Sequence, residues 1–279
     1  MSWVEVGDRV FQRRYEPCDV TVSVVAGADG LALVDTRCSL AEARELREHL
    51  REISAAPVRW VVNTHIHFDH VWGNAEFVAP RQTPPAQVWG SAEMIAAMRG
   101  AARDPAAAEF KEYLAGQSEE WAAKLAELEE YVPDHEVRGA HDLDLGGGRV
   151  VSLRQVGRGH TDGDMILHVP DADVLLMGDL LEQSGAPAFG PDSYPLEWAP
   201  TLDAALTLSG PDTRFVPGHG DATDASFVRA QRDSIRAVAD QCAALRAAGV
   251  PADKALAAGD WPYDPKHLEH AVARAYAQL

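Results

Sequence analysis

Residues 64–70 read THIHFDH and follow, after Asn63, the short apolar run 60–62, WVV, which predicts a buried β-strand. Imidazole and carboxylate groups are the usual protein ligands of zinc and related divalent ions. His65 and His67 are two residues apart, so in an extended backbone their side chains point the same way and can bind one ion. The stretch therefore predicts a metal site at the end of a strand.

Further candidate ligands suggest that this site holds more than one ion. Asp69 and His70 lie just beyond the histidine pair, where the chain is expected to turn, and can reach a second ion. Three later segments place one candidate ligand each after a strand, in a turn of small residues: His160 in GRGHTDG, Asp179 at the end of LLMGD and His219 in PGHG. Five histidines and two aspartates are too many for one tetrahedral ion and suit two ions side by side.

The bulk composition of the 279 residues limits the partners that we expect. The 25 basic and 43 acidic residues give a net charge of −18, which repels phosphate backbones and argues against a nucleic-acid partner. Residues 1–14 are mixed and charged and do not predict a signal peptide, and no apolar run has transmembrane length. Cys18, Cys38 and Cys242 are scattered, which is typical of a reducing compartment. We expect a cytoplasmic protein with a small-molecule substrate and no membrane partner; no pattern indicates an oligomeric state.

The residues before the motif predict a βαβ unit. The runs 20–26 and 31–35 predict a hairpin, an S-x-x-E capping box at Ser39 starts a helix, and 58–62 is the next strand. Strand, helix and strand in this order indicate parallel pairing, and ligands gather at the carboxyl ends of such strands. Asp35 lies at one of these ends, so it either supports the site from behind the ligands or is an ordinary turn residue.

The later segments predict one domain over residues 1–279. A helical insertion over about 91–138 either closes over the site as a lid or packs as an amphipathic helix on the core. We also expect strands at 149–156, 165–169, 174–177 and 214–216, a long surface loop at 185–200, and a helical tail at 224–279.

Together, the motifs H-x-H-x-D-H, G-H-T, G-D after an apolar strand, and P-G-H-G resemble the metallo-β-lactamase superfamily of metal-dependent hydrolases, over about residues 3–230. The resemblance implies a four-layer αββα sandwich, an α/β fold in which two sheets face each other, with helices outside and the metals at one edge. It also implies three ligand groups: His65, His67 and His160 on the first ion, Asp69, His70 and His219 on the second, and Asp179 bridging both.

The residue type at position 179 indicates which branches of the superfamily this sequence resembles most. The β-lactamases of the superfamily usually carry cysteine or serine at this position, whereas aspartate is similar to the glyoxalase II, lactonase and phosphodiesterase branches. The residues after Asp179 do not match the Leu-Phe-x-Gly-Gly-Cys-Gly-Arg run of glyoxalase II, and the nuclease branches carry an added domain. The sequence of segment 180–200 is similar to that of a broad group of hydrolases in this superfamily.

The expected reaction is a two-metal hydrolysis. Two zinc ions, with iron or manganese as alternatives, lower the pKa of a bridging water, and the resulting hydroxide attacks an ester, thioester, lactone or amide carbonyl. Asp69 orients the nucleophile or accepts its proton. Asp35 and Thr161 are candidates for fixing the imidazole tautomers. Trp72, Tyr194 and Trp198 are candidate substrate-wall residues, with packing in the core or in a loop as the alternative for each.

Other functions remain open from the sequence. Some relatives use one iron at the positions of His65, His67 and His160 as a dioxygenase of sulfur substrates. A di-iron enzyme with a flavodoxin partner is disfavoured because no flavin-binding domain follows. β-Lactamase-like activity is a third alternative. A non-catalytic metal-binding protein would be expected to lack ligands, whereas all seven positions are filled.

Overall fold

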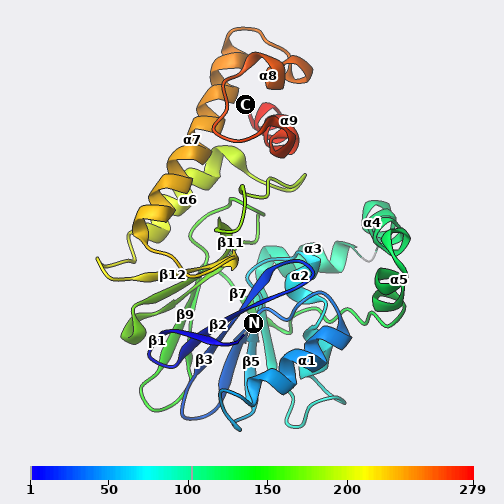
Figure 1. Cartoon of the computed structure of the whole chain (residues 1–279), viewed down its shortest axis with the longest axis vertical. Coiled ribbons are helices and arrows are strands. Elements are labelled where there is room, and N and C mark those ends of the chain that lie inside the picture. The colour runs from blue at the N-terminus through cyan, green and yellow to red at the C-terminus, as the bar shows by residue number, and fades with distance from the viewer. Residues whose placement is uncertain (1, 102) are drawn as a thin grey trace.

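The computed structural model describes residues 2–101 and 103–279 and contains two half-sheets that meet at one junction (Figure 1). The first half-sheet consists of β1 (Val4–Gly7), β2 (Val10–Tyr15), β3 (Val20–Ala26), β4 (Leu31–Val34), β5 (Val58–Val62), β6 (Gln87–Ser91) and β7 (His135–Val137). The second consists of β8 (Ala140–Asp144), β9 (Val150–Arg154), β10 (Ile166–Val169), β11 (Val174–Glu182) and β12 (Arg214–His219). They join where His219 of β12 pairs with Val20 of β3.

The helices lie between these strands and after the last of them. They are α1 (Leu40–Leu50), α2 (Phe68–Val71), α3 (Ala92–Ala101), α4 (Pro105–Gln117), α5 (Glu119–Ala126), α6 (Pro195–Leu206), α7 (Ala225–Ala247), α8 (Ala252–Ala258) and α9 (Glu269–Gln278), with short 3-10 turns η1 (Asn74–Phe77), η2 (Pro170–Ala172) and η3 (Pro265–His267). In the part of the chain that the structure describes, no helix combines the length and the apolar composition needed to cross a bilayer.

Three apolar clusters define four layers. Val34 and Val62 of the first half-sheet share a buried cluster with Leu153 and Leu176 of the second, so the two half-sheets face each other. A second cluster joins the outer face of the first half-sheet to α1, and a third joins the second half-sheet to α6, α7 and α9. This order, helix, sheet, sheet and helix, confirms the predicted αββα fold (Figure 1).

Several local predictions are also confirmed. β3 and β4 form the predicted antiparallel hairpin, and β4 pairs with β5 in parallel. Ser39 caps α1, because its hydroxyl accepts a hydrogen bond from the backbone N–H of Glu42 at 3.2 Å. The carboxyl ends of β4 and β5 therefore lie side by side, which brings Asp35 next to the residues that follow β5.

Two predicted segments differ from the structure. The expected helical insertion at about 91–138 contains helices only over 92–126, and β7 at its end belongs to the sheet. The expected loop at 185–200 ends early, because α6 already begins at Pro195. Proline at the first helical position lacks only an N–H that would have no partner there, so it starts this helix and does not prevent it.

Candidate metal centre

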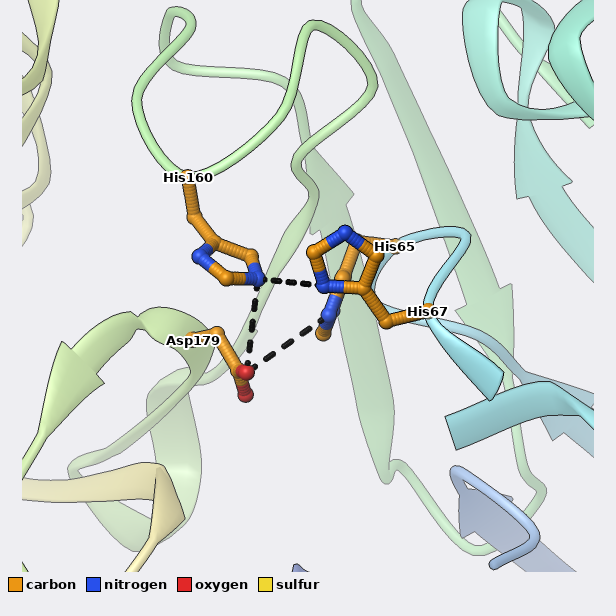
Figure 2. A group of neighbouring side chains, drawn as sticks. All are labelled: His65, His67, His160 and Asp179. Carbon is orange, nitrogen blue, oxygen red and sulfur yellow. Dashed lines mark hydrogen bonds and ion pairs between the residues drawn. The ribbon is translucent and has the colours of Figure 1, made fainter. Parts of the chain in front are cut away.

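The seven predicted ligands come together at the edge where the strands end. His65, His67, Asp69 and His70 lie between β5 and the end of α2, and His160 lies in the β9–β10 loop. Asp179 lies within β11, and His219 ends the parallel neighbour β12. Figure 2 shows four of these side chains pointing toward one another: His65 and His67 from one loop, His160 from a second and Asp179 from β11.

His65, His67, His160 and Asp179 form the first ligand group. The Nε2 atom of His160 lies 2.7 Å from Nδ1 of His67. Asp179 Oδ2 lies 3.6 Å from Nε2 of His65 and 3.4 Å from Nε2 of His160 (Figure 2). All four offer one ligand atom to the same small volume.

Asp69, His70 and His219 form the second group. The Nε2 atom of His219 lies 3.4 Å from Asp69 Oδ2, and Nε2 of His70 lies 3.7 Å from the same oxygen. Asp179 also faces this group, because its Oδ1 is 3.2 Å from Nε2 of His70 and its Oδ2 is 3.3 Å from Nε2 of His219. The carboxylate of Asp179 thus lies between the two groups.

Each imidazole of the first group, and that of His219, has its other ring nitrogen held by a neighbour outside the cluster. The pairs are His65 Nδ1 with Thr64 Oγ1 at 2.9 Å, His67 Nε2 with Asp192 Oδ2 at 3.0 Å, His160 Nδ1 with the Ala188 carbonyl at 2.9 Å, and His219 Nδ1 with the Cys18 carbonyl at 3.0 Å. Carbonyl and carboxylate oxygens only accept, so the ring nitrogen facing them carries the proton. In the neutral ring, the nitrogen that faces the cluster is then left with a free lone pair, as a metal ligand requires.

Asp35 fixes the fifth imidazole. Its Oδ2 accepts hydrogen bonds from Nδ1 of His70 at 2.8 Å and from the Thr64 hydroxyl at 2.9 Å, and its Oδ1 accepts from the Thr64 backbone N–H at 2.9 Å. Through the Thr64 hydroxyl, the same carboxylate also orients His65. The other candidate for this role, Thr161, donates instead to Asp164 at 2.7 Å within its own loop.

Burial and charge set the protonation of the cluster. Burial lowers the pKa of His160 to about 4 and, together with the neighbouring His70, holds the pKa of His65 well below its usual value. Burial also opposes charge on His219, but the Asp179 carboxylate outweighs it and raises the pKa of His219 to about 10. For His70, burial is likewise outweighed by Asp179 and other carboxylates, which raise its pKa well above the usual value.

The residues present fit a pair of divalent metal ions. Among the residues that the structure describes, His65 Nε2, His70 Nε2 and Asp179 Oδ1 are buried and have no hydrogen-bond partner. Buried polar atoms without partners are rare in proteins, and a cation would satisfy all three. The nitrogens of His67 and His160 that face each other at 2.7 Å both carry lone pairs in the assigned tautomers, so they also require a cation or a proton between them.

Glycine provides the space for Asp179. A side chain at Gly218, which precedes the ligand His219, would overlap the Asp179 carboxylate, and one at Gly178 would meet Thr64 Cβ at 2.7 Å. Gly178 also has a φ of 52°, which glycine adopts without strain. The small-residue turns that marked the ligands in the sequence are therefore needed for the ligands to approach one another.

Three acidic residues near the site were not predicted. Asp192 holds His67, Asp164 holds the loop of His160 through Thr161, and Glu182 lies within reach of Asp179 and His219. Asp192 lies in an irregular segment with no local pattern. Glu182 lies three residues after Asp179 in a strand that was predicted to end at residue 177.

The three candidate wall residues have different surroundings. Trp72 lines a large cavity beside the cluster. Tyr194 is not among the described residues that line it; its ring lies instead between the guanidinium groups of Arg158 and Arg274. Trp198 is 0% exposed in the apolar cluster under α6 and donates from its indole N–H to the Leu180 carbonyl at 3.0 Å. Of the three, only Trp72 is placed where a substrate could reach it.

The sequence is similar to proteins of one known family. A family model described as the metallo-beta-lactamase superfamily matches residues 15–219. The metallo-beta-lactamase type 2 of Bacillus cereus is 28% identical over 105 residues, 37% of this chain and 41% of that protein. A linear primary-alkylsulfatase of Pseudomonas sp. is 34% identical over 65 residues, 23% of this chain and 12% of that protein. These matches cover less than half of the length of either curated relative.

Solved structures share the fold at low identity. The stereoselective inverting sec-alkylsulfatase of Pseudomonas sp. matches with a TM-score of 0.77 and 17% identity, covering 99% of this chain and 50% of that one. A metallo-beta-lactamase from Pontibacter korlensis matches with a TM-score of 0.62 and 18% identity, covering 84% of this chain and 98% of that one. Both matches show the same fold.

Proposed function

The chain belongs to the metallo-beta-lactamase superfamily, and from this premise we propose that it is a hydrolase that uses two divalent metal ions, zinc foremost, to cleave an ester, thioester, lactone or amide of a small molecule. The observation that carries the proposal is the clustering of the seven candidate ligands, in which the carboxylate of Asp179 lies between the two groups. The net charge of −18 favours a small-molecule substrate over a nucleic acid.

The seven candidate ligands would bind two metal ions at two neighbouring positions. His65, His67 and His160 would hold one ion, Asp69, His70 and His219 the other, and Asp179 both. Two adjacent divalent ions supply Lewis acidity and lower the pKa of water toward about 7, so that a nucleophile exists at neutral pH. Asp35 and Asp192 keep the ring nitrogens of His70 and His67 in the orientation that this binding needs.

Asp69 is the proposed catalytic residue. Its carboxylate lines the cavity, next to His219 and within reach of the centre, so it can orient water and accept its proton. In the reaction, the water oxygen bonds to the carbonyl carbon, the bond from that carbon to the leaving oxygen, sulfur or nitrogen breaks, and the leaving group takes up a proton. The products are a carboxylate and an alcohol, thiol or amine.

Metal analysis combined with a substrate panel tests the proposal. Protein purified without added metal is expected to contain about two zinc per chain. Hydrolysis of the best ester, thioester, lactone or cephalosporin should fall by about 100-fold or more in kcat/KM in Asp69→Ala. Asp253→Ala is the matched control, because Asp253 lies on α8 with an exposed side chain beside Lys254.

Two results would overturn the proposal. Unchanged hydrolysis in Asp69→Ala would remove the residue from the mechanism. A single iron per chain, with oxidation of a sulfur substrate and no hydrolysis, would establish the mononuclear oxygenase instead, in which only the group around His65, His67 and His160 is used.

A second candidate is hydrolysis of an alkyl sulfate ester. It is favoured by the 34% identity to part of a linear primary-alkylsulfatase. An alkyl sulfate therefore belongs in the substrate panel, with sulfate release as the readout. The candidate is rejected if sulfate release stays at the level of the Asp69→Ala variant.

A further inference from the structure

We propose that the substrate carries an apolar arm of several carbon atoms beside its scissile carbonyl, and that this arm binds between α2, α3 and α4. The inference rests on the proposed hydrolase function and adds the class of substrate that the site would take. It is carried by the cavity next to the candidate metal centre and by the side chains that form one wall of that cavity.

The cavity is large enough for such a substrate. Its volume is about 1150 Å³, and its lining includes the proposed catalytic Asp69 and the ligands His67, His160 and His219. Small-molecule sites usually enclose about 300–1,000 Å³. A carbonyl group at the metal ligands would occupy only one end of this volume, so the remainder has room for a further part of the substrate.

The ligand motif itself supplies the start of an apolar wall. Ile66 and Phe68 occupy the positions between the ligands of H-x-H-x-D-H, and both are half-buried and line the cavity. Trp72 follows Phe68 one helical turn later, with the two ring centroids 5.0 Å apart. The residues that alternate with the ligands thus give the metal centre an apolar side.

The wall continues onto α3 and α4. Met98 of α3 lines the cavity, and so does Phe110 of α4, whose ring centroid lies 5.6 Å from that of Phe68. Phe110 is 42% exposed, and α4 buries only Leu114. An exposed phenylalanine that faces a cavity gains burial when an apolar ligand enters, by about 25 cal/mol for each Å² removed from water. Phe189 provides an apolar surface from the loop before α6.

The charged residues near this wall are already paired. Lys111 on α4 forms an ion pair with Glu130 at 2.6 Å, and Asp104 caps α4 by accepting from the Ala106 N–H at 3.0 Å. Lys111 therefore already has a counter-charge, and the Asp104 carboxylate is already engaged at the start of α4. An uncharged alkyl or aryl arm is the chemistry that matches this part of the cavity.

Chain-length series on the zinc-loaded full chain test the inference. One series consists of p-nitrophenyl acetate, butyrate and octanoate, which lengthens the acyl side. The other consists of ethyl, butyl and octyl acetate, which lengthens the alcohol side. In at least one series, kcat/KM is expected to rise about fourfold for each methylene that enters the cavity, which corresponds to about 0.8 kcal/mol.

Substitutions on α4 locate the effect. Phe110→Ala is expected to lower the octanoate-to-acetate ratio of kcat/KM by about tenfold, since it removes the exposed ring from the wall. Phe110→Leu should recover most of that ratio. Tyr113→Ala is the matched control, because Tyr113 is a 62% exposed aromatic residue on the same helix that is not among the described residues lining the cavity.

A binding measurement separates this inference from the proposed function. By calorimetry, octanoate is expected to bind the zinc-loaded protein more tightly than acetate does, and Phe110→Ala should reduce that difference while Tyr113→Ala retains it. If no ester is hydrolysed but this pattern appears, the hydrolase proposal fails and the apolar site stands. If esters are hydrolysed but neither series depends on chain length, or Phe110→Ala behaves as Tyr113→Ala does, the inference is overturned and the hydrolase stands.

Discussion

At the scale of single residues, Asp35 connects the fold to the site. It follows β4 in a left-handed conformation with a φ of 65°, which costs energy for most side chains but little for aspartate or asparagine. This conformation directs its buried carboxylate toward Thr64 and His70. The left-handed backbone of Asp35 therefore places its carboxylate where it fixes the tautomer of His70, a predicted ligand.

Replacing Asp35 by Asn tests this role. Asparagine tolerates the positive φ and can still accept from the Thr64 N–H, so the variant should fold. Its amide group, however, would donate to Nδ1 of His70 and move the ring proton to Nε2, which faces the centre. Zinc affinity at the site of His70 is expected to fall about 10- to 100-fold, measured by competition with a chromogenic chelator.

The control for this substitution is Asp142→Asn, whose side chain is exposed on β8 and pairs with Arg154. It should bind zinc as the unmodified protein does. Equal affinity in Asp35→Asn and in the control would show that the tautomer of His70 does not depend on Asp35.

The raised pKa values of two candidate ligands predict how the affinity for metal depends on pH. Nearby carboxylates raise the pKa of His219 to about 10, so without metal this ring carries an extra proton at pH 7, and they raise the pKa of His70 above its usual value as well. Zinc must displace the proton on the ring nitrogen that binds it, so zinc binding should release at least about one proton per chain at pH 7. Apparent affinity should then rise with pH, by about tenfold per pH unit for each proton released, and level off near the pKa of His219, about 10.

Calorimetry in two buffers of different ionisation enthalpy measures this release. His141→Ala, which removes an exposed imidazole stacked on Trp89, should leave it unchanged. A binding heat that is the same in both buffers would contradict the prediction.

At the scale of elements, the sequence predicted the strands, turns and helix caps that are determined by neighbouring residues. The hairpin of β3 and β4, the cap at Ser39 and the strand before the histidine motif all follow from neighbouring residues, and so do the small-residue turns that present His160, Asp179 and His219. These three candidate ligands could be predicted because glycines stand beside them in the sequence. Gly218 shows why glycine is needed, since a side chain there would overlap the Asp179 carboxylate.

The elements that could not be predicted depend on distant contacts. The first residues of α6, 195–200, were predicted to belong to a loop rich in proline and glycine, yet Trp198 among them is buried by residues from β11, α7 and α9. This burial matches the alternative given for Trp198, packing in the core. Asp192 reaches His67 across 125 positions of the chain, a contact without any local signal.

At the scale of the whole molecule, the candidate metal centre joins the two half-sheets. The residues from His65 to His70 follow a strand of the first half, whereas His160, Asp179 and His219 belong to the second. Ions bound between them would act as a cross-link that exists only in the folded protein. Metal binding should therefore stabilise the fold as any ligand specific for the native state does.

Removal of metal tests this cross-link. At a free zinc concentration of about 100 times Kd, the expected stabilisation is about 2.7 kcal/mol, or about 5–10 °C in Tm for a chain of this size. Adding EDTA should lower Tm by that amount, and adding zinc back should restore it. His219→Ala should show a much smaller difference between the two conditions, whereas an equal Tm with and without EDTA in the unmodified protein would contradict the prediction.

The junction between the half-sheets has a consequence for the order of folding. His219 pairs with Val20, which lies nearly 200 residues earlier in the sequence, and it is also a predicted ligand. Contacts between such distant residues form late, because a long chain segment must first be ordered. The second ligand group is therefore incomplete until β12 has docked against β3. A chain still emerging from the ribosome can present the histidines of residues 65–70, but it acquires its full affinity for metal only when the last strand closes the junction.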